Sequence, residues 1–571
     1  MTNKNNLKQI LVAYFTMEVG IESDIPTYAG GLGILAGDTL RSFADLNVPV
    51  IGVSLLYWKG SFRQSIADGK QIEEEVRWSP KEYMNLLPQK VTVMIEDRKV
   101  VVRAWEYRIK GLQREVPVLF LDTDLPGNSS YDRTLTHYLY GNDTHYRLCQ
   151  EIVLGIGGMR MLEAIHVEPL YYHMNEGHSA LLTLELLSKS KRDVEFTWDA
   201  EHVYNNETVR GKCVFTTHTP VEAGHDRFGY EMVSQLLTDA VVPLHVIQEY
   251  GGKNDLNMTT LALNLSKYIN GVAKKHGEVS KQMFPGYDIE SITNGIHSAF
   301  WTSPTLRVLY DKYIPGWVAD PFSLRYALGI PDNQLWTAHL QAKQTLIQEV
   351  NKRTRSQFKE DAFTIGYARR FTGYKRPDLV FHDVGRLKAI AEKVGDIQLI
   401  FAGKAHPKDQ YGKELIQKVI ATGKELKGRV RVVFLENYTI DLAKLVVAGC
   451  DVWLNNPQRP HEASGTSGMK AAVNGVPQIS TLDGWWLEGH IEGITGWAIG
   501  PHPGDSGFEH DSNPGDEAQD LYEKLEHEIV PRYYHDSRRW ITIMKYAIAI
   551  NGSFFNTHRM VQQYVTHSYF S

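Results

Sequence analysis

Residues 451–472 read DVWLNNPQRPHEASGTSGMKAA and join a short apolar run to a loop of small polar residues and a helical pattern. The run from Asp451 to Asn455 has the length and the apolar character of a buried strand. The small residues from Ser464 to Gly468 leave backbone N–H groups and hydroxyls free to bind a phosphate or sugar hydroxyls. A strand, a loop and a helix in this order form the basic unit of an α/β domain.

The same alternation extends outward along most of the chain. A helix is expected from Gly37 to Leu46, and further strands are expected at residues 9–15, 48–55, 118–121, 169–173, 213–217, 363–367, 397–402 and 430–435. Strands that alternate with helices predict parallel sheets covered on both faces. We find no internal repeat. Residues 500–516 are expected to form a surface loop, and residues 536–569 a pair of helices broken near Asn551.

Length and composition exclude several classes of protein. A chain of 571 residues is too long for one ordinary core, so two or more domains are expected. The 61 basic and 67 acidic side chains nearly balance, which argues against a polybasic surface for nucleic acid or membrane. The three cysteines are far apart, no signal peptide is recognisable, and no segment reaches the ~20 apolar residues that span a bilayer. A cytoplasmic protein is therefore expected.

A glycine-rich turn, YAGGLGILAGD at residues 28–38, follows the first expected strand. Glycines let the backbone approach a ligand, and a helix that begins there directs free N–H groups at an anion. Tight packing of the turn explains the glycines equally well. The spacing matches neither a Walker motif nor a dinucleotide fingerprint, so neither ATP nor NAD is indicated.

Four cations follow the expected strand at residues 363–367, namely Arg369, Arg370, Lys375 and Arg376. Ligands of open α/β sheets bind outside the carboxyl ends of the strands. Arginine can hold phosphate oxygens through two hydrogen bonds, and lysine acts as a compact charge. The cluster therefore favours a phosphate site over the alternative, a solvated basic turn.

Lys470 falls in the first turns of the helix expected after the loop at residues 464–468. A cation at that end of a helix opposes the helix dipole, so the pKa of Lys470 should be lowered. A lysine with a lowered pKa is suited to covalent chemistry with an aldehyde cofactor. The residues alone leave open that Lys470 is an ordinary lysine near a helix start.

Taken together, these segments resemble the glycogen/starch/maltodextrin (α-glucan) phosphorylase family. The segment EASGTSGMK at residues 462–470 is similar to the cofactor-lysine motif of the family, and RFTGYKR at residues 370–376 to its substrate-phosphate motif. Further matching segments are FLENY at 434–438, TNGI at 293–296 with Trp301, GVAKKH at 271–276, TLDG at 481–484 and GGLG at 30–33. They occur in collinear order from about Tyr14 to the last helix, and their joint order is specific.

The resemblance implies an architecture of two Rossmann-like domains facing a cleft, the glycosyltransferase B-type arrangement. Residues 1–294 would form a glucan-binding domain, and residues 295–545 a domain with the cofactor lysine and the phosphate site. Residues 546–571 would form a helix that crosses back to the first domain.

The resemblance also implies an activity, namely reversible phosphorolysis of terminal α-1,4-linked glucose. An α-glucan or maltodextrin and inorganic phosphate would give glucose 1-phosphate, and the phosphate of pyridoxal 5'-phosphate would act as proton shuttle. Two alternatives stay open: a sugar-nucleotide-dependent glucosyltransferase on the same fold, and a non-catalytic glucan-binding protein. No nucleic-acid or membrane partner is expected, and a homo-oligomer is left open.

Site residues follow from the matching motifs, position by position. The implied catalytic residues are Arg370, Lys375, Lys470 and His218. The implied cofactor-binding residues are Lys470, Thr466, Gly465, Trp301, Gly31 and Arg369. The implied substrate-binding residues are Glu462, Ser464, Asn294, Tyr374, Gly33, Glu18 and Tyr438. No metal ligand is implied.

The chain departs from the family pattern at several points. It is several hundred residues shorter than the familiar members, so control by phosphorylation or nucleotides is not expected. Arg369 stands where the family has a lysine, and Ser467-Gly468 stands where it has Gly-Asn. The segment at residues 455–461 is unfamiliar and could alter the choice of donor or acceptor. His178 and His297 are expected to be hydrogen-bonded structural histidines.

Overall fold

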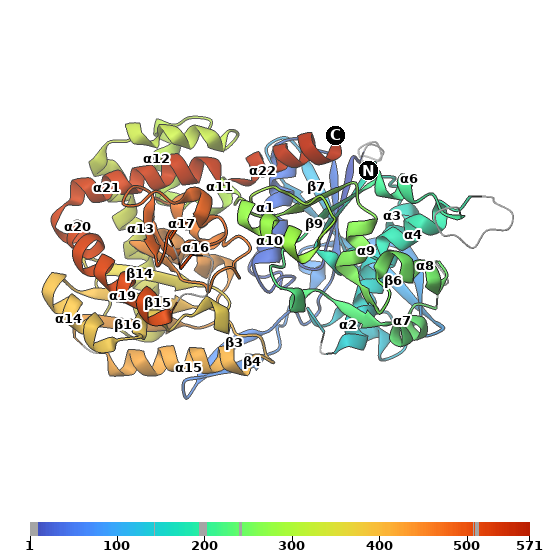
Figure 1. Ribbon diagram of the computed structural model, residues 1–571, viewed down its shortest axis with the longest axis horizontal. Coiled ribbons are helices and arrows are strands. Elements are labelled where there is room, and N and C mark those ends of the chain that lie inside the picture. Colours follow the sequence, from blue (N-terminus) through green and yellow to red (C-terminus); the bar gives the residue numbers. More distant parts are fainter. Residues whose placement is uncertain are drawn as a thin grey trace.

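The computed structural model has two lobes, and each of them is an α/β domain (Figure 1). It describes residues 10–141, 143–192, 203–238, 242–426, 428–505, 507–508 and 513–570. Most of the second half of the chain forms one lobe, and the C-terminal helix lies on the other lobe with the first half. Within these ranges no helix is long and apolar enough to cross a membrane.

The large sheet of the first lobe has the strand order β13-β12-β9-β8-β1-β2-β7-β6-β5 over the described residues. The strands from β13 to β7 run parallel, and β6 runs antiparallel to both β7 and β5. In sheet order the bounds are β13 Glu290–Ser291, β12 Tyr268–Gly271, β9 Cys213–Thr216, β8 Tyr171–Asn175, β1 Val12–Thr16, β2 Val50–Leu55, β7 Glu115–Asp122, β6 Arg98–Lys110 and β5 Asn85–Ile95.

The sheet of the second lobe is parallel throughout its described strands, in the order β16-β15-β14-β17-β18-β19. In sheet order the bounds are β16 Val430–Leu435, β15 Ile397–Ala402, β14 Phe363–Ala368, β17 Val452–Asn455, β18 Gln478–Thr481 and β19 Gly496–Ile499. Counted from β14, this is the Rossmann order 3-2-1-4-5-6. The parallel part of the first sheet, counted from β1 and read from β7 to β13, has the same order with β13 added as a seventh strand. The two domains are therefore Rossmann-like.

Helices connect the strands in both lobes. In the first lobe they are α1 Gly31–Asp45, α2 Thr144–Ile152, α3 Gly158–Ala164, α4 Leu182–Lys189, α6 Asn206–Arg210, α7 Tyr230–Leu236, α8 Leu244–Gly251, α9 Met258–Asn264 and α10 Lys274–Met283. In the second lobe they are α11 Ser298–Trp301, α12 Pro304–Tyr313, α13 Asp332–Thr354, α14 Val384–Val394, α15 Gln410–Glu425, α16 Ile440–Gly449, α17 Ser467–Ala472, α18 Trp486–Gly489, α19 Pro514–Lys524, α20 Val530–His535 and α21 Ser537–Tyr546.

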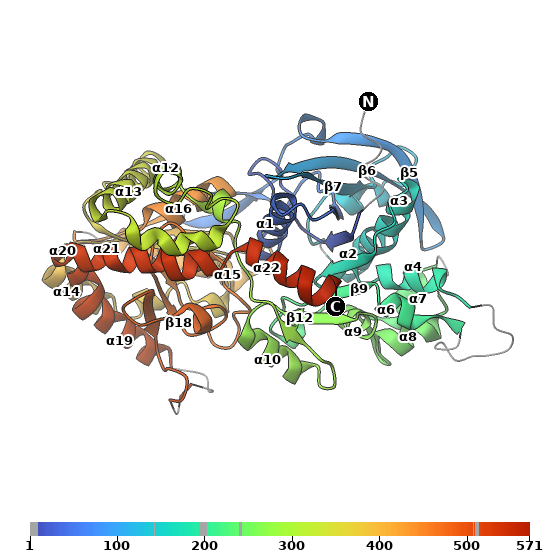
Figure 2. The ribbon, with the colours of Figure 1, turned by 90° about the horizontal axis from the view of Figure 1, so that it is seen from above.

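The chain crosses between the lobes twice. Ile292 belongs to an apolar core of the first lobe, whereas Ile296 belongs to the core of the second. Near the C-terminus, Phe555 packs in the second core and Met560 packs in the first. Helix α22, Thr557–Tyr564, thus returns to the first lobe, and Figure 2 shows α21 and α22 following one another across the junction.

A hairpin extends from the first lobe onto the second. Its strands are β3, Arg63–Ala67, and β4, Lys70–Glu74, and it lies beside α15 in Figure 1. Gln64 accepts a hydrogen bond from the Asn437 N–H at 2.9 Å, and Gln71 accepts one from the Ala405 N–H at 3.0 Å. Asn437 follows β16, and Ala405 follows β15. Loops at the carboxyl ends of the second sheet therefore contact the hairpin, which follows β2 of the first sheet.

Most of the expected strands are confirmed, two of them, β15 and β16, with the same bounds. The expectation of parallel sheets is wrong for residues 85–110, where β5 and β6 form an antiparallel edge. Their apolar residues alternate with charged ones because one face of the edge is exposed, as the alternating burial of β6 shows. Helix α1 begins at Gly31, six residues before the expected start, because the glycines form its first turn. The expected loop at 500–516 ends where α19 begins at Pro514, and residues 506 and 509–512 lie outside the described residues.

A buried ion pair fixes the start of β17. The Lys343 ammonium, fully buried in α13, donates to Asp451 Oδ2 at 2.6 Å, to the Ala362 carbonyl at 2.7 Å and to the Tyr533 hydroxyl at 2.7 Å. Asp451 also accepts hydrogen bonds from His339 and from the Thr364 N–H. Burial by itself would raise the pKa of Asp451, but Lys343 and His339 lower it below the usual range.

We expect Asp451→Asn to destabilise the second lobe because the substitution leaves the buried Lys343 ammonium without a carboxylate. Breaking a buried pair costs about 3–5 kcal/mol. Urea unfolding followed by tryptophan fluorescence measures the loss. Lys352→Met, on the exposed side of the same helix, removes an ion pair with Glu349 and should cost less than about 1 kcal/mol. Equal stability of the two variants would contradict the expectation.

Candidate active site

Strand order places the two motif loops of the second lobe side by side. Strands β14 and β17 are neighbours at the point where the order of the sheet reverses. The basic segment follows β14, and the loop at residues 456–466 follows β17. In open α/β sheets, ligands bind at this switch point.

The Glu462 carboxylate lies between two cations. Arg369 Nη2 donates to Glu462 Oε2 at 2.6 Å, and Lys375 Nζ lies 2.7 Å from Oε1 and 2.6 Å from Oε2. Burial by itself would raise the pKa of Glu462, but Arg369 and Lys375 together lower it to about 2. Glu462 is therefore ionised at neutral pH and accepts hydrogen bonds.

Arg369 has two further donors without a partner. Its Nε and Nη1 are buried and have no hydrogen-bond acceptor among the described residues. Arg370 is exposed by contrast, and no described group forms a hydrogen bond or ion pair with its side chain. Lys375 Nζ lies 4.4 Å from the centre of the Tyr374 ring. The switch point thus offers buried cationic donors on one side and an exposed cation at its rim.

Lys470 is buried in α17 with its amine against an aromatic ring. Its Nζ lies 3.8 Å from the centre of the Trp301 ring, and it makes no hydrogen bond or ion pair within the described part of the chain. Burial lowers the pKa of Lys470 to about 8, and Asp38 opposes the change. The predicted direction of the shift is confirmed, but burial is its cause.

Trp301 is held in place from both lobes. Its indole N–H donates to Asp38 Oδ2 of α1 at 2.7 Å. The Asn474 amide donates to the backbone carbonyls of Trp301 at 2.9 Å and Lys470 at 2.8 Å. The first lobe therefore contributes to the surroundings of a lysine that the second lobe carries. Asp38 ends the glycine-rich segment, but nothing in the sequence indicated this role.

The loop between β17 and α17 presents further polar groups. Ser464 Oγ is buried without a partner among the described residues. Gly465 has a φ of 91°, which favours glycine. Asp483 accepts hydrogen bonds from the Glu462 N–H at 2.8 Å and the Gly484 N–H at 2.9 Å, and burial raises its pKa to about 7. Asp483 thus fixes the backbone of Glu462, a role that its motif alone did not reveal.

In the first lobe, Glu18 holds the glycine-rich turn. Its Oε2 accepts hydrogen bonds from the Ala29 N–H at 2.6 Å and the Gly30 N–H at 3.1 Å, and its Oε1 accepts one from Tyr140 at 2.8 Å. A Cβ on Gly33 would lie 2.7 Å from Glu18 Oε2, so only glycine fits there. Gly31, in contrast, is exposed, and nothing lies within 4 Å of its ideal Cβ position.

The remaining predicted site residues occupy separate positions. His218 Nε2 lies 2.7 Å from Asn175 Oδ1, and burial lowers the pKa of His218 to about 4. Asn294 Oδ1 is buried without a described partner. The Tyr438 hydroxyl donates to the Ala368 carbonyl at 3.3 Å. Among the described residues, direct side-chain contacts join Glu462 to Arg369 and Lys375, and Lys470 to Trp301, but do not extend to His218, Asn294 or Gly31.

The unfamiliar segment at residues 455–461 braces the basic loop. Arg376 donates to the carbonyls of Asn456 at 2.9 Å and Pro457 at 3.0 Å, and it pairs with Glu517. The Gln458 N–H donates to the Tyr374 carbonyl at 2.7 Å. The segment therefore fixes the backbone on both sides of Lys375.

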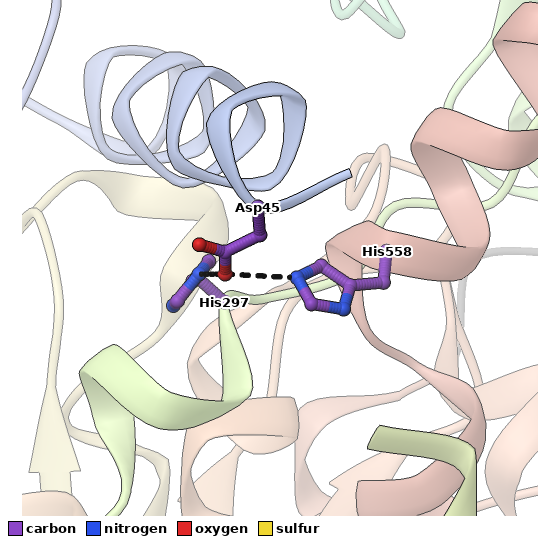
Figure 3. A group of neighbouring side chains, drawn as sticks. All are labelled: Asp45, His297 and His558. Atoms are coloured by element: carbon purple, nitrogen blue, oxygen red, sulfur yellow. Dashed lines mark hydrogen bonds and ion pairs between the residues drawn. The ribbon is translucent and has the colours of Figure 1, made fainter. Parts of the chain in front are cut away.

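Three buried polar side chains, Asp45, His297 and His558, converge outside this group (Figure 3). His297 Nε2 and His558 Nε2 lie 2.8 Å and 3.1 Å from Asp45 Oδ2. His297 Nδ1 accepts a hydrogen bond from the Phe300 N–H, so its proton is on Nε2 and points at Asp45. This arrangement fits a hydrogen-bonded structural histidine better than a metal ligand. His178 is also buried, 3.5 Å from Asp226.

The residues around Lys470 fit the chemistry of pyridoxal phosphate. Covalent attachment of an aldehyde needs an amine that loses its proton near neutral pH, and Lys470 has one. Trp301 supplies an aromatic wall, and Gly465 and Thr466 lie in the loop directly before α17. The unpartnered donors of Arg369 can receive an oxyanion.

Comparison with known proteins places the chain in a family. The family model described as carbohydrate phosphorylase matches residues 15–124 and 226–492, which is more than half of the chain. The chain belongs to the carbohydrate phosphorylase family. A maltodextrin phosphorylase of Thermococcus litoralis is 40% identical over 98% of this chain and 70% of the relative. A glycogen phosphorylase of Aquifex aeolicus is 37% identical over 98% of this chain and 86% of the relative.

A third relative is an uncharacterized protein of Methanocaldococcus jannaschii, 34% identical over 98% of this chain and 99% of the relative.

The lowered pKa of Lys470 predicts how this residue reacts. Only the neutral amine attacks an aldehyde, so labelling of Lys470 in cofactor-free protein should increase with pH around a midpoint near 8. Pyridoxal phosphate is added for a short time, fixed with borohydride, and located by peptide mapping. An α-acetyl-lysine standard in the same tube should show a midpoint near 10.4. Equal midpoints for Lys470 and the standard would contradict the expectation.

Proposed function

We propose that the chain catalyses the reversible phosphorolysis of terminal α-1,4-linked glucose in an α-glucan or maltodextrin, giving glucose 1-phosphate. The observation that carries the proposal is the pair of buried, unpartnered donors on Arg369 beside Glu462 and Lys375. Buried cationic donors without an acceptor are costly and are suited to an oxyanion. Phosphorolysis requires phosphate as that oxyanion. The substrate class is supported by relatives that are named as maltodextrin and glycogen phosphorylases.

Substrate phosphate binds among the three cations in this proposal. Arg369 and Lys375 hold it from the buried side, and Arg370 adds charge from the exposed side. Lys375 carries three donors, so it can bind Glu462 and a phosphate oxygen together. These cations also compensate the repulsion between substrate phosphate and a second phosphate group nearby.

The glucosyl group binds to acceptors and donors that have free capacity. Glu462 is ionised and accepts hydrogen bonds from sugar hydroxyls. Ser464 Oγ and Asn294 Oδ1 are buried without described partners and bind further hydroxyls. Tyr374 and Tyr438 lie beside the phosphate loop, while Glu18 fixes the turn that contains Gly33. His218 is neutral at pH 7 because of its lowered pKa, so it acts through hydrogen bonds.

Lys470 would hold pyridoxal 5'-phosphate, with Trp301 beside it and Thr466, Gly465 and Gly31 as further binding residues. Arg369 has two free donors, so it would bind the cofactor phosphate as well as the substrate phosphate. When bound, the cofactor supplies a phosphate group that can exchange a proton with the substrate phosphate. The chain's own residues hold the two phosphates close together, align the glucosyl group and compensate the negative charge of the two phosphates.

Several expectations from the sequence stay predictions beside this proposal. They are the cytoplasmic location, the domain limits at 1–294, 295–545 and 546–571, the homo-oligomer that the sequence leaves open, and the lack of control by nucleotides. Each of them can be tested without altering the proposal for the reaction.

The reaction is tested by incubating the purified chain with pyridoxal phosphate, maltodextrin and inorganic phosphate, and measuring glucose 1-phosphate. Wild-type protein should form it, and Lys470→Ala should form at least about a thousandfold less because it cannot hold the cofactor, which matches the magnitude of losing a central catalytic interaction. Cofactor content is read from visible absorbance. Full activity and full cofactor content in Lys470→Ala would contradict the proposal.

The role of Arg369 is tested by Arg369→Met, which removes the charge and the donors but keeps most of the side-chain volume. We expect KM for inorganic phosphate to rise about tenfold or more, since hydrogen bonds to charged groups contribute about 1.5–3 kcal/mol. Arg386→Met in α14 is the matched control. It removes an ion pair with Glu526 and should keep the wild-type KM. An unchanged KM in Arg369→Met would assign the phosphate to other residues.

A further inference from the structure

Arg559 of α22 donates hydrogen bonds to the segment at residues 293–294, which connects the two lobes. Its Nη1 donates to the Thr293 carbonyl at 2.6 Å, and its Nη2 donates to the Asn294 carbonyl at 3.0 Å. The remaining donors reach the Gln563 side chain at 2.7 Å and the Phe554 carbonyl at 3.2 Å. The guanidinium thus donates its hydrogen bonds to backbone carbonyls and a neutral amide. Such an arrangement fixes the geometry of the segment rather than neutralising a charge.

The same segment is held from two other directions. The Thr293 hydroxyl lies 2.9 Å and 2.8 Å from the carboxylate oxygens of Glu488 in α18, which also accepts the Lys274 N–H at 3.0 Å. The Asn294 N–H donates to the Val272 carbonyl at 3.0 Å. The backbone N–H of Asn294 is therefore bound by the first lobe, and its backbone carbonyl is bound by α22.

Helix α22 itself is locked beside this segment. His558, the neighbour of Arg559, and His297, three residues after Asn294, meet at Asp45 of α1 (Figure 3). A Cβ on Gly295 would lie 2.3 Å from the backbone of Asn556, so the connecting segment and the start of α22 are in direct contact. The reach of Arg559 to the carbonyls is therefore fixed by the packing of α22 and not by a flexible side chain alone.

Asn294 has a buried amide oxygen with no partner among the described residues, although its backbone is bound on both sides. We propose that Arg559 is a positioning residue, which holds Asn294 in place so that its side-chain amide meets the glucosyl group. The inference rests on the proposed function and adds the C-terminal helix to the machinery of that site. It assigns the crossing helix a role in substrate alignment in addition to joining the lobes.

The test is a double-mutant cycle. Arg559→Lys keeps the charge but cannot bind both carbonyls, and it should lower kcat for phosphorolysis about tenfold while KM for phosphate stays within about twofold. Cofactor absorbance should be unchanged. Asn294→Ala is made alone and together with Arg559→Lys. If Arg559 acts through Asn294, the double variant should be no slower than Asn294→Ala, because the two losses are not additive.

The control is Arg539→Lys in α21, whose side chain is exposed, and it should keep the wild-type kcat. Gln563→Met is a milder second variant, since it removes only one partner of Arg559, and it should lower kcat less and show the same non-additivity with Asn294→Ala. Additive losses for both pairs, or a wild-type kcat in Arg559→Lys, would overturn the inference. A wild-type chain that forms no glucose 1-phosphate would instead overturn the proposed function, and the inference with it.

Discussion

The buried carboxylate of Glu462, bound by Arg369 and Lys375, is the interaction on which the site depends. An ionised carboxylate is costly to bury unless cations compensate it. The compensating cations follow β14, whereas Glu462 follows β17. The ion pairs between them therefore hold two loops together at the switch point of the sheet. Because Arg369 keeps two donors free, the cluster has net capacity for a further anion.

The second requirement is a lysine whose amine is not consumed by an ion pair. Lys470 meets it because its neighbour is the Trp301 ring and not a carboxylate. Trp301 is itself oriented by Asp38, which belongs to the other lobe. Neither lobe alone therefore forms the surroundings of Lys470, and the packing of the two lobes against each other is a condition for the site.

Two connections keep the lobes in this relation. On one side, the hairpin of β3 and β4 exchanges hydrogen bonds with loops at the carboxyl ends of β15 and β16 (Figure 1). On the other side, α22 returns to the first lobe and binds the connecting segment through Arg559 (Figure 2). In addition, the Phe300 ring lies 3.7 Å from the Arg41 guanidinium of α1 and 3.6 Å from the Lys444 ammonium of α16.

The sequence by itself determined the α/β class, most strands, the family and the segments that carry the site, since apolar periodicity and ordered motifs are local properties of the chain. It could not show that Glu462 binds Arg369 and Lys375, or that Asp38, Asp483 and Arg559 fix their neighbours. Those contacts join residues tens to hundreds of positions apart, and only the packed fold decides which of them meet. The same holds for the pKa of Lys470. Its position near a helix start predicted the direction of the shift, but the cause is tertiary burial.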